Sequence, residues 1–362
     1  MPWYSVLVRY DDPIKDSLLL DAVQPLFDRL QACGEAYFRP HWRRGPHIRL
    51  NFRTTDELFS QVVLPTTREA LGTFLAEHPS TTRLDPAVVL PMHRRLAELE
   101  NDTAPLEPWL PNNSIHATAY QERSGALGSR ELARILTAFD VATTPLVFSM
   151  LDHVRRGGQR LRLAFDLMIA TAHGLSGMSP AGFVSFRSHS EAFITNESQS
   201  GSDRSSAGRR AGWERHYDRH SASLTTRLSH ILATLDGAGK AVPFVRAWVD
   251  ALEPYGVHAH ALATAEQPLI DAAGEDPYGT LVPARSPFHR TLGADEAIAL
   301  LRSPAFTRYR LMLNLTYLHM TRLGISPEER FLLCHLAAAA AEDVFGSSSQ
   351  ELAHDLVRRA AG

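Results

Sequence analysis

The sequence predicts an α+β fold, in which an N-terminal antiparallel sheet with flanking helices is combined with a larger, mainly helical part. Three observations predict it. Polar and apolar side chains alternate along residues 3–10, as in a half-buried strand. Two further strand-like segments lie on either side of a short Gly/Pro turn, with helical patterns around them. From Ser129 onward, most apolar residues recur at helical spacing.

The predicted elements alternate between strand and helix in the first part of the chain. Tyr4, Val6 and Val8 fall on one face of a strand, because successive side chains of a strand point to opposite faces. The elements predicted in order are a strand at 3–10, a helix from Asp16, strands at 35–43 and 47–53 joined by a turn at 44–46, and a helix at 56–77. This order favours an antiparallel sheet with helices on one face.

A surface connection, one more strand and then helices follow. Residues 101–113 are rich in proline and predict a connection, whereas residues 114–121 alternate like a strand. Leu132, Ile135 and Phe139 recur at the spacing of one helix face. The sequence therefore predicts that the chain becomes mainly helical from this point.

We predict that residues 1–362 form a single unit. Residues 1–125 are its sheet-bearing part and residues 126–362 its mainly helical part. Residues 196–212 are dominated by Ser, Gly, Asp and Arg, with almost nothing to bury, and predict a mobile loop. Such a loop is either a lid or an exposed insertion.

Composition excludes several classes of protein. A formal net charge of -3 supplies no excess positive charge for a phosphate backbone, so nucleic-acid binding is disfavoured. Cys33 and Cys334 lie in apolar helical patterns, which favours reduced thiols and the cytoplasm. The longest apolar run, residues 331–341, is shorter than the roughly 20 residues that cross a bilayer. We therefore expect no membrane span, and residues 1–13 do not have the pattern of a signal peptide.

The first motif is HWRRGPHIRLNF, residues 41–52. On a strand, His47, Arg49 and Asn51 lie in a row on one face. Such a row of polar side chains is either solvated or part of a site.

The second motif is LTYLHMTRLG, residues 315–324. On a helix, His319 and Arg322 are neighbours at three-residue spacing and are expected to face one pocket. Gly324 is typical of a helix end, and Ser-Pro-Glu-Glu at 326–329 is typical of the start of the next helix.

With these two motifs the chain resembles the C-terminal elimination domain of lantibiotic dehydratases. In the enzymes that eliminate glutamate, the second strand of the first motif reads approximately HIRLR, and both of its arginines are thought to serve the site. Here Arg49 matches the first arginine, and Asn51 replaces the second. Because asparagine cannot supply the fixed charge that a carboxylate leaving group needs, this departure favours a different reaction.

A third segment, GFVSFRSHSEAF at 182–193, resembles the stand-alone pyridine synthases of thiopeptide pathways. The resemblance implies a substrate, a ribosomal precursor peptide that carries azoles and two dehydroalanines. It also implies a formal 4+2 cycloaddition, in which one dehydroalanine reacts as the iminol of its amide, followed by loss of water and of the leader peptide. No cofactor is expected. Further candidate partners are other biosynthetic enzymes and a second copy of the chain.

Candidate site residues follow from the motifs and from the chemistry that the resemblance implies. Near pH 7 a neutral histidine can give or take a proton, and serine hydroxyls can hold a developing iminol oxygen. A cluster of arginines on the predicted hairpin would suit an acidic leader. The candidate catalytic residues are Ser188, His189, Glu191, Ser286 and His319, and the candidate binding residues are Arg39, Arg43, Arg44, His47, Arg49, Asn51 and Arg322.

Alternatives remain open. The chain could be a glutamate-eliminating enzyme of a split dehydratase, or a partner that binds the leader without catalysis. His216 and His220, four residues apart on a predicted helix, could bind zinc, although no HEXXH or cysteine cluster accompanies them. No dinucleotide, P-loop or hydrolase motif stands between a strand and a helix.

Overall fold

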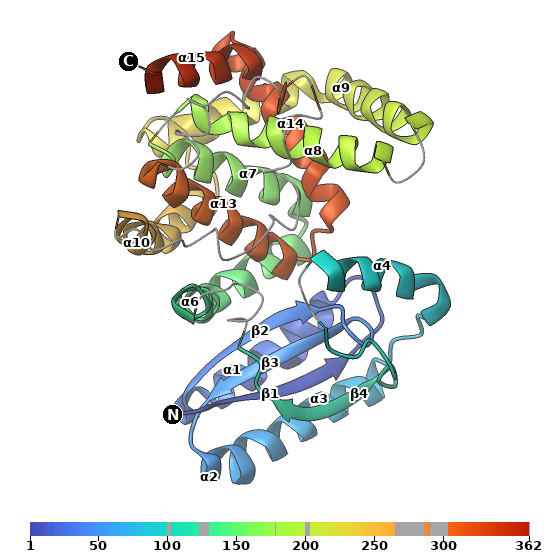
Figure 1. Ribbon diagram of the computed structural model, residues 1–362. Coiled ribbons are helices and arrows are strands. Elements are labelled where there is room, and N and C mark those ends of the chain that lie inside the picture. The colour runs from blue at the N-terminus through green and yellow to red at the C-terminus, as the bar shows by residue number, and fades with distance from the viewer. Residues whose placement is uncertain are drawn as a thin grey trace. The chain divides into compact units, whose positions relative to one another are not determined.

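The computed structural model describes residues 1–99, 103–122, 130–177, 179–199, 203–264, 286, 288–289 and 303–361 (Figure 1). The chain forms two compact units: unit 1 contains residues 1–158 and 321–324, and unit 2 contains residues 159–320 and 325–362. Unit 1 extends to Gly158, because helix α6 (Arg130–Arg155) packs against strand β2 of the sheet.

Unit 1 is built on a four-stranded sheet with the strand order β2-β3-β1-β4. Every neighbouring pair of strands is antiparallel, which confirms the predicted sheet. The strands are β1 (Trp3–Arg9), β2 (Glu35–His41), β3 (His47–Arg53) and β4 (Ser114–Ala119).

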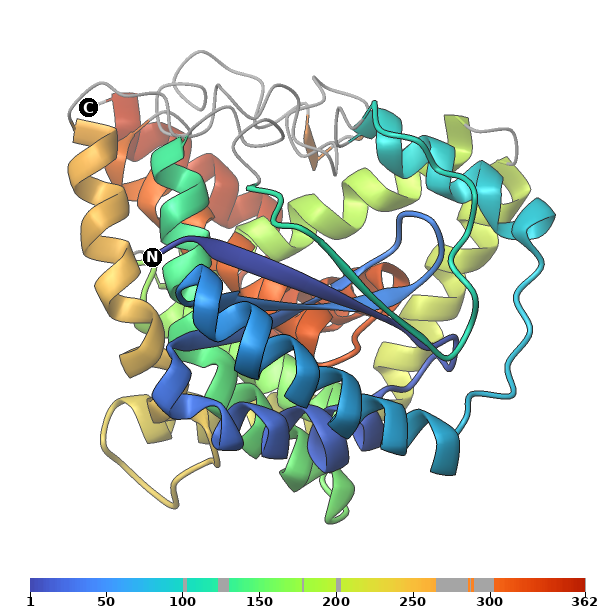
Figure 2. The same ribbon diagram turned by 90° about the horizontal axis from the view of Figure 1, so that it is seen from below.

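One face of the sheet is apolar and covered by helices, and the other carries polar side chains. Val6 pairs with Leu50 across β1 and β3, and both side chains are fully buried. Helices α1 and α3 cover this face in both views (Figures 1 and 2). Because side chains alternate along a strand, Arg49 and Asn51 lie on the opposite face.

The helices of unit 1 confirm the predicted helical segments. Thr55 starts the second segment, where its side chain accepts a hydrogen bond from the Leu58 backbone N–H. The helical elements are a π-helical turn at Leu18–Val23, α1 (Gln24–Arg29), a 3₁₀ turn at Gln31–Cys33, α2 (Asp56–Leu58), a π-helical turn at Phe59–Val63, α3 (Leu64–Glu77), α4 (Pro86–Leu99) and α6.

Unit 2 is helical in the part of the chain that the structure describes. Helix α14 packs against α7, α8 and α9, and its five alanines at 337–341 allow close approach of these helices because their side chains are small. The helices are α7 (Arg160–Gly174), α8 (Val184–Gln199), α9 (Asp203–Leu235), α10 (Val245–Thr264), α13 (Pro304–Arg322), α14 (Pro327–Phe345) and α15 (Ser349–Ala361), with a 3₁₀ turn at Ala181–Phe183.

The helix boundary in the second motif is as predicted. Helix α13 ends at Arg322, and Gly324 adopts a left-handed φ of 81°, which glycine does at little cost. Ser326 and Glu329 then form a reciprocal capping box at the start of α14.

The predicted loop at 196–212 is wrong over most of its length. Helix α8 continues to Gln199 and α9 begins at Asp203, while residues 200–202 lie outside the described residues. Tertiary contacts explain the helix. Arg210 binds the Glu191 carboxylate with two hydrogen bonds, and Trp213 packs in an apolar cluster. These contacts stabilise the helix although the segment contains few apolar residues, which is why its composition wrongly predicted a loop.

Helix α6 is long and apolar enough to cross a membrane by length and composition. More than half of its apolar window is buried inside the protein, and Asp140 within it pairs with Arg39. Both properties are typical of the core helix of a globular unit.

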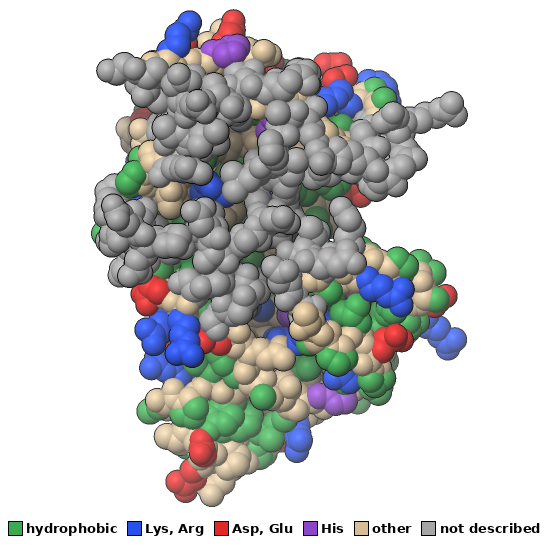
Figure 3. Space-filling model, viewed as in Figure 1, with side chains coloured by type: hydrophobic (Ala, Val, Ile, Leu, Met, Phe, Trp, Pro, Cys, Tyr) green, Lys and Arg blue, Asp and Glu red, His purple; other side chains and the backbone are tan. Residues whose placement is uncertain are grey.

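On the face shown in Figure 3, Lys and Arg side chains form several separate groups with Asp and Glu among them.

Candidate active site

Helix α8 brings the third motif into a cluster of polar side chains in unit 2. The motif is helical from Val184 onward. Ser188 and His189 are neighbours on α8, and each hydrogen-bonds a side chain that is distant in the sequence. The structure therefore joins these two predicted residues to new partners.

His289 lies between two serine hydroxyls, and the sequence analysis did not predict it. Its Nε2 is 3.1 Å from Ser188 Oγ, and its Nδ1 is 2.8 Å from Ser286 Oγ. Both Ser286 and His289 are buried. A neutral imidazole has one N–H donor and one acceptor nitrogen, so one serine accepts a hydrogen bond from the ring while the other donates one.

Burial keeps this imidazole neutral near pH 7. It lowers the pKa of His289 below the usual value, although the negative charge of Glu191 and a hydrogen bond at the Ser188 backbone act in the opposite direction. The ring can thus accept a proton at one nitrogen and release one from the other.

His189 forms a second imidazole–hydroxyl pair, with Tyr317 of α13. Burial, and then the charges of Arg330 and Arg310, lower the pKa of His189 to about 3. Burial raises the pKa of Tyr317 well above its ordinary value, so the phenol keeps its proton. Its oxygen lies 2.7 Å from His189 Nδ1 and 3.4 Å from Cys334 Sγ.

Glu191 is an ion-pair partner and is not placed to act as a general base. Its two carboxylate oxygens accept hydrogen bonds of 2.6 and 2.8 Å from Arg210. Burial raises the pKa of Glu191, but the hydrogen bonds and charge of Arg210 outweigh burial and the net pKa is lowered. Glu191 therefore stays ionised, and its charge acts on His289.

His319 and Arg322 do not share surroundings, and the prediction that they face one pocket is wrong. His319 has no exposed surface, and its ring centroid lies 4.5 Å from that of Trp248. Arg322, which is almost fully buried, binds Asp140 and hydrogen-bonds Thr143 at 2.8 Å. The long guanidinium side chain reaches a carboxylate on α6, whereas the imidazole packs on an indole.

The first motif forms a polar row on β3, as predicted. Arg49 Nε donates to His47 Nε2 at 3.2 Å, and Arg49 Nη1 donates to Gln121 Oε1 at 2.8 Å. Asn51 is buried, and its Oδ1 accepts a hydrogen bond of 2.5 Å from Ser5. Of the three, only Arg49 is partly exposed, so it is the one that an incoming ligand can reach.

The three arginines of the predicted basic cluster on the hairpin contact groups within the chain. Arg39 binds Asp140, and Arg43 is buried with its Nη2 2.7 Å from Gln121 Oε1. Arg44 donates to the carbonyl oxygen of Pro108 at 2.7 Å. Each guanidinium already has a partner within the chain, which local composition does not reveal.

The predicted histidine pair on α9 is not part of a metal site among the described residues. The rings of His216 and His220 lie 4.7 Å apart, as four-residue spacing on a helix requires. Within the described part of the chain, no group of three or more His, Cys, Asp or Glu side chains is placed to hold a metal ion. Both cysteines are free thiols.

Unit 1 contains an antiparallel sheet with a polar face, and unit 2 is helical in its described part. Unit 2 also contains buried, neutral imidazoles that are hydrogen-bonded to hydroxyls. Together these features define an α+β protein whose site is suited to proton transfer. The chain belongs to the family described as lantibiotic biosynthesis dehydratase C-term, whose model matches residues 3–341. This confirms the resemblance that the motifs predicted.

Solved structures support the same fold. The structure described as "Pyridine synthase, TbtD, from thiomuracin biosynthesis" is 37% identical, with a TM-score of 0.77, over 96% of this chain and 99% of that chain. The crystal structure of TsrL is 20% identical, with a TM-score of 0.70, over 98% of each chain. The tRNA-dependent lantibiotic dehydratase MibB from Microbispora sp. 107891 is 17% identical, with a TM-score of 0.50, over 96% of this chain and 28% of that chain. A search of curated proteins found no match.

Proposed function

We propose that this protein is a thiopeptide pyridine synthase, which forms a central pyridine from two dehydroalanines of a ribosomal precursor peptide and releases the leader peptide. The observation that carries the proposal is the imidazole of His289 held between the hydroxyls of Ser188 and Ser286. The 37% identity to a pyridine synthase over nearly the whole chain supports the same reaction.

The arrangement suits the first step of this reaction, which converts an amide to its iminol. That step removes one proton from the amide nitrogen and adds one proton to the carbonyl oxygen. Through one serine, the acceptor nitrogen of His289 takes a proton, and through the other serine the opposite nitrogen gives one. The ring ends as the other neutral tautomer, and no net charge is created.

The later loss of water is also a balanced proton exchange. When the new ring loses its hydroxyl as water, one proton is added to the departing oxygen and one is removed from the ring. No external acid, base or oxidant enters the balance of this step.

His189 and Tyr317 supply a second donor in the same unit. In the proposed reaction the Tyr317 hydroxyl, 2.7 Å from Nδ1, donates to that nitrogen, so that His189 carries its proton on Nε2 and donates a hydrogen bond to a substrate oxygen. A donor that is already oriented stabilises charge developing on oxygen. Holding the two alkenes together contributes further, since orientation of reacting groups is worth roughly 7 to 11 kcal/mol.

Glutamate elimination receives no support at residue 51. Asn51 is buried, neutral and bonded to Ser5, so it offers no cation to a departing carboxylate. Partly exposed Arg49 is the candidate for contact with the substrate. We place the protein in the cytoplasm, and the match of one family model to residues of both units supports their action as one elimination-domain-like unit.

The test is mass spectrometry of a dehydrated, azole-bearing precursor peptide incubated with the purified protein. Wild-type protein should produce loss of water together with release of the leader. His289→Asn should slow this conversion at least about tenfold, because one proton relay worth about 1.4 kcal/mol of barrier is lost. The matched control is His354→Asn, which changes an exposed histidine on α15 and should react at the wild-type rate.

Three results would contradict the proposal in different ways. With a glutamylated precursor as the substrate, a mass change that corresponds to lost glutamate would identify an elimination enzyme. Tight leader binding with no mass change would identify a non-catalytic partner. Equal rates for wild type and His289→Asn, with ring formation intact, would exclude the relay while leaving the reaction in place.

A further inference from the structure

Unit 1 contains a pocket of about 620 Å³ that no step of the proposed reaction uses. Its lining comes from Arg9 at the end of β1 and from Asp11, from residues 80–84 and 86, and from residues 109, 110 and 112. Its volume is in the range of pockets that bind ligands.

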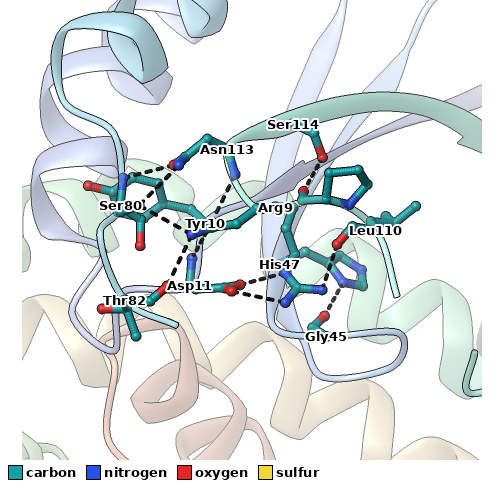
Figure 4. Close-up of polar contacts among 12 residues, drawn as sticks. Arg9, Tyr10, Asp11, Gly45, His47, Ser80, Thr82, Leu110, Asn113 and Ser114 are labelled. Atoms are coloured by element: carbon teal, nitrogen blue, oxygen red, sulfur yellow. Dashed lines mark hydrogen bonds and ion pairs between the residues drawn. The ribbon is translucent and has the colours of Figure 1, made fainter. Parts of the chain in front are cut away.

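One wall is an irregular segment that hydrogen bonds hold in place. Asn113 accepts from the Ser80 backbone N–H at 2.8 Å and donates to the Ser80 carbonyl at 3.0 Å (Figure 4). Asp12 accepts hydrogen bonds from the hydroxyls of Ser80 and Thr82, at 2.7 and 2.6 Å. Segments outside helices and strands are usually mobile, so this pinning indicates a preformed wall.

The floor is an ion pair without net charge. Arg9 and Asp11, both almost fully buried, form two hydrogen bonds. The remaining Nη1 of Arg9 donates to the carbonyl oxygens of Arg44 and Leu110, at 2.9 and 3.0 Å (Figure 4). Arg9 is thus fully engaged in holding the pocket together and has little capacity left for a ligand.

One other lining residue keeps donors available. Arg83 is exposed and forms no ion pair with any residue that the structure describes. Trp109 also lines the pocket, but its indole N–H is buried away from the accessible surface. Because Arg83 gives the pocket a net positive charge, the ligand that fits is an anion with oxygen acceptors.

Apolar lining narrows the ligand further. Leu84, Pro86 and Leu110 line the same pocket as Arg83, so the pocket offers apolar contact together with one cation. An acidic peptide, with carboxylates between apolar side chains, has this chemistry.

We propose that this pocket binds an acidic stretch of the leader peptide, with Arg83 holding a carboxylate. The inference rests on the proposed function, because it takes the substrate to be a leader-bearing peptide. It replaces the predicted leader site at Arg39, Arg43 and Arg44, whose guanidinium groups are bound within the chain.

The test measures fluorescence anisotropy of a labelled precursor peptide with three proteins: wild type, Arg83→Gln and Arg68→Gln. Arg83→Gln should weaken binding at least about tenfold, which corresponds to about 1.4 kcal/mol. Arg68→Gln removes an exposed arginine from α3, outside the pocket lining, and should bind as wild type does. A second peptide, with leader Asp and Glu changed to Asn and Gln, should bind both variants equally.

A residue-specific probe locates the site. The chain has five tryptophans, and in protein labelled with 5-fluorotryptophan the Trp109 resonance is assigned by its absence in Trp109→Phe. Adding the acidic peptide should shift this resonance in the ¹⁹F spectrum. A shift that is absent, or binding that falls equally in Arg83→Gln and Arg68→Gln, would overturn the pocket.

The two proposals can fail separately. If Arg83→Gln binds the peptide as wild type does while the wild-type protein still forms the pyridine, only the pocket is wrong. If wild type forms no pyridine but its peptide binding depends on Arg83, the pocket stands as an acidic-peptide site and the proposed reaction is wrong.

Discussion

His47 of β3 should make unit 1 sensitive to mild acid. The ring is almost fully buried, Nδ1 donates to the Gly45 carbonyl at 2.9 Å, and Nε2 accepts from Arg49 Nε at 3.2 Å. A second proton on this ring, on Nε2, would place that N–H donor against the Nε–H donor of Arg49. Burial, only partly offset by the hydrogen bond to Gly45, and then the nearby charges of Arg49, Arg9 and Arg43 lower the pKa of His47 to about 3.

The sign of the effect follows from proton binding. In the unfolded chain a histidine has a pKa near 6.5, so between about pH 6.5 and pH 3 the unfolded state binds the extra proton. The stabilisation is fully present above pH 6.5 and is lost as the pH falls toward 3. One proton corresponds to a slope of about 1.4 kcal/mol per pH unit, so roughly 2 to 3 kcal/mol is lost between pH 6 and pH 4.

The perturbation that isolates this effect is His47→Asn, which keeps an N–H donor but does not titrate. Urea unfolding followed by circular dichroism at pH 4, 5, 6 and 7 gives the free energy of unfolding for both proteins. We expect the variant to be less stable at pH 7, and the gap to shrink by about 2 to 3 kcal/mol from pH 6 to pH 4.

The control is His78→Asn, which replaces an exposed histidine in the same unit. A gap that stays constant with pH for His47→Asn would refute the conclusion that the fold keeps His47 neutral.

Three further predictions concern buried groups. His189→Asn retains an acceptor for the Tyr317 hydroxyl, so the circular dichroism spectrum should be unchanged while pyridine formation slows at least about tenfold; unchanged turnover would remove His189 from the site. Because the pKa of His189 is lowered to about 3, that residue should cause no fall in kcat between pH 8 and pH 5, and an apparent pKa near 6.5 that disappears in His189→Asn would contradict this. Asp140→Ala removes the shared partner of Arg39 and Arg322 and should lower the free energy of unfolding by about 3 to 5 kcal/mol, whereas a loss below about 1 kcal/mol in urea unfolding at pH 7 would show that the two guanidinium groups find other partners.

Local patterns predicted the secondary structure well where the structure depends on neighbouring residues. Alternation along residues 3–10 and 47–53 identified two strands, because one face of each is apolar and the other polar. Gly324 and the capping box at Ser326 identified the boundary between α13 and α14, since these signals act within a few residues.

The site was predicted only in part, because its contacts join distant segments. Ser188 and Ser286 were expected as hydroxyl donors, but their common partner His289 lies in a stretch without periodicity. The only local signal is that a histidine follows a predicted site serine by three residues. The sequence analysis did not select Tyr317, although it lies in the second motif two residues before His319, which was selected.

Pairing of charges was the least predictable feature. The sequence shows three arginines close together on a hairpin, but it does not show that Arg39 meets Asp140 or that Arg43 meets Gln121. Likewise, residues 203–212 look unable to form a core, and the ion pair of Arg210 with Glu191 becomes visible only in three dimensions. Both errors come from treating charged side chains as solvated by default.

The Ser5–Asn51 pair separates this protein from glutamate-eliminating enzymes by more than one amino-acid change. The two residues face each other across β1 and β3, and both are buried. Arginine at position 51 would place a charge in that buried space opposite a serine that cannot neutralise it, which is strongly destabilising. Ser5, or another close neighbour, would have to change as well. Evolution from one reaction to the other would therefore pass through a variant that folds poorly, unless a residue on the opposite strand changed first.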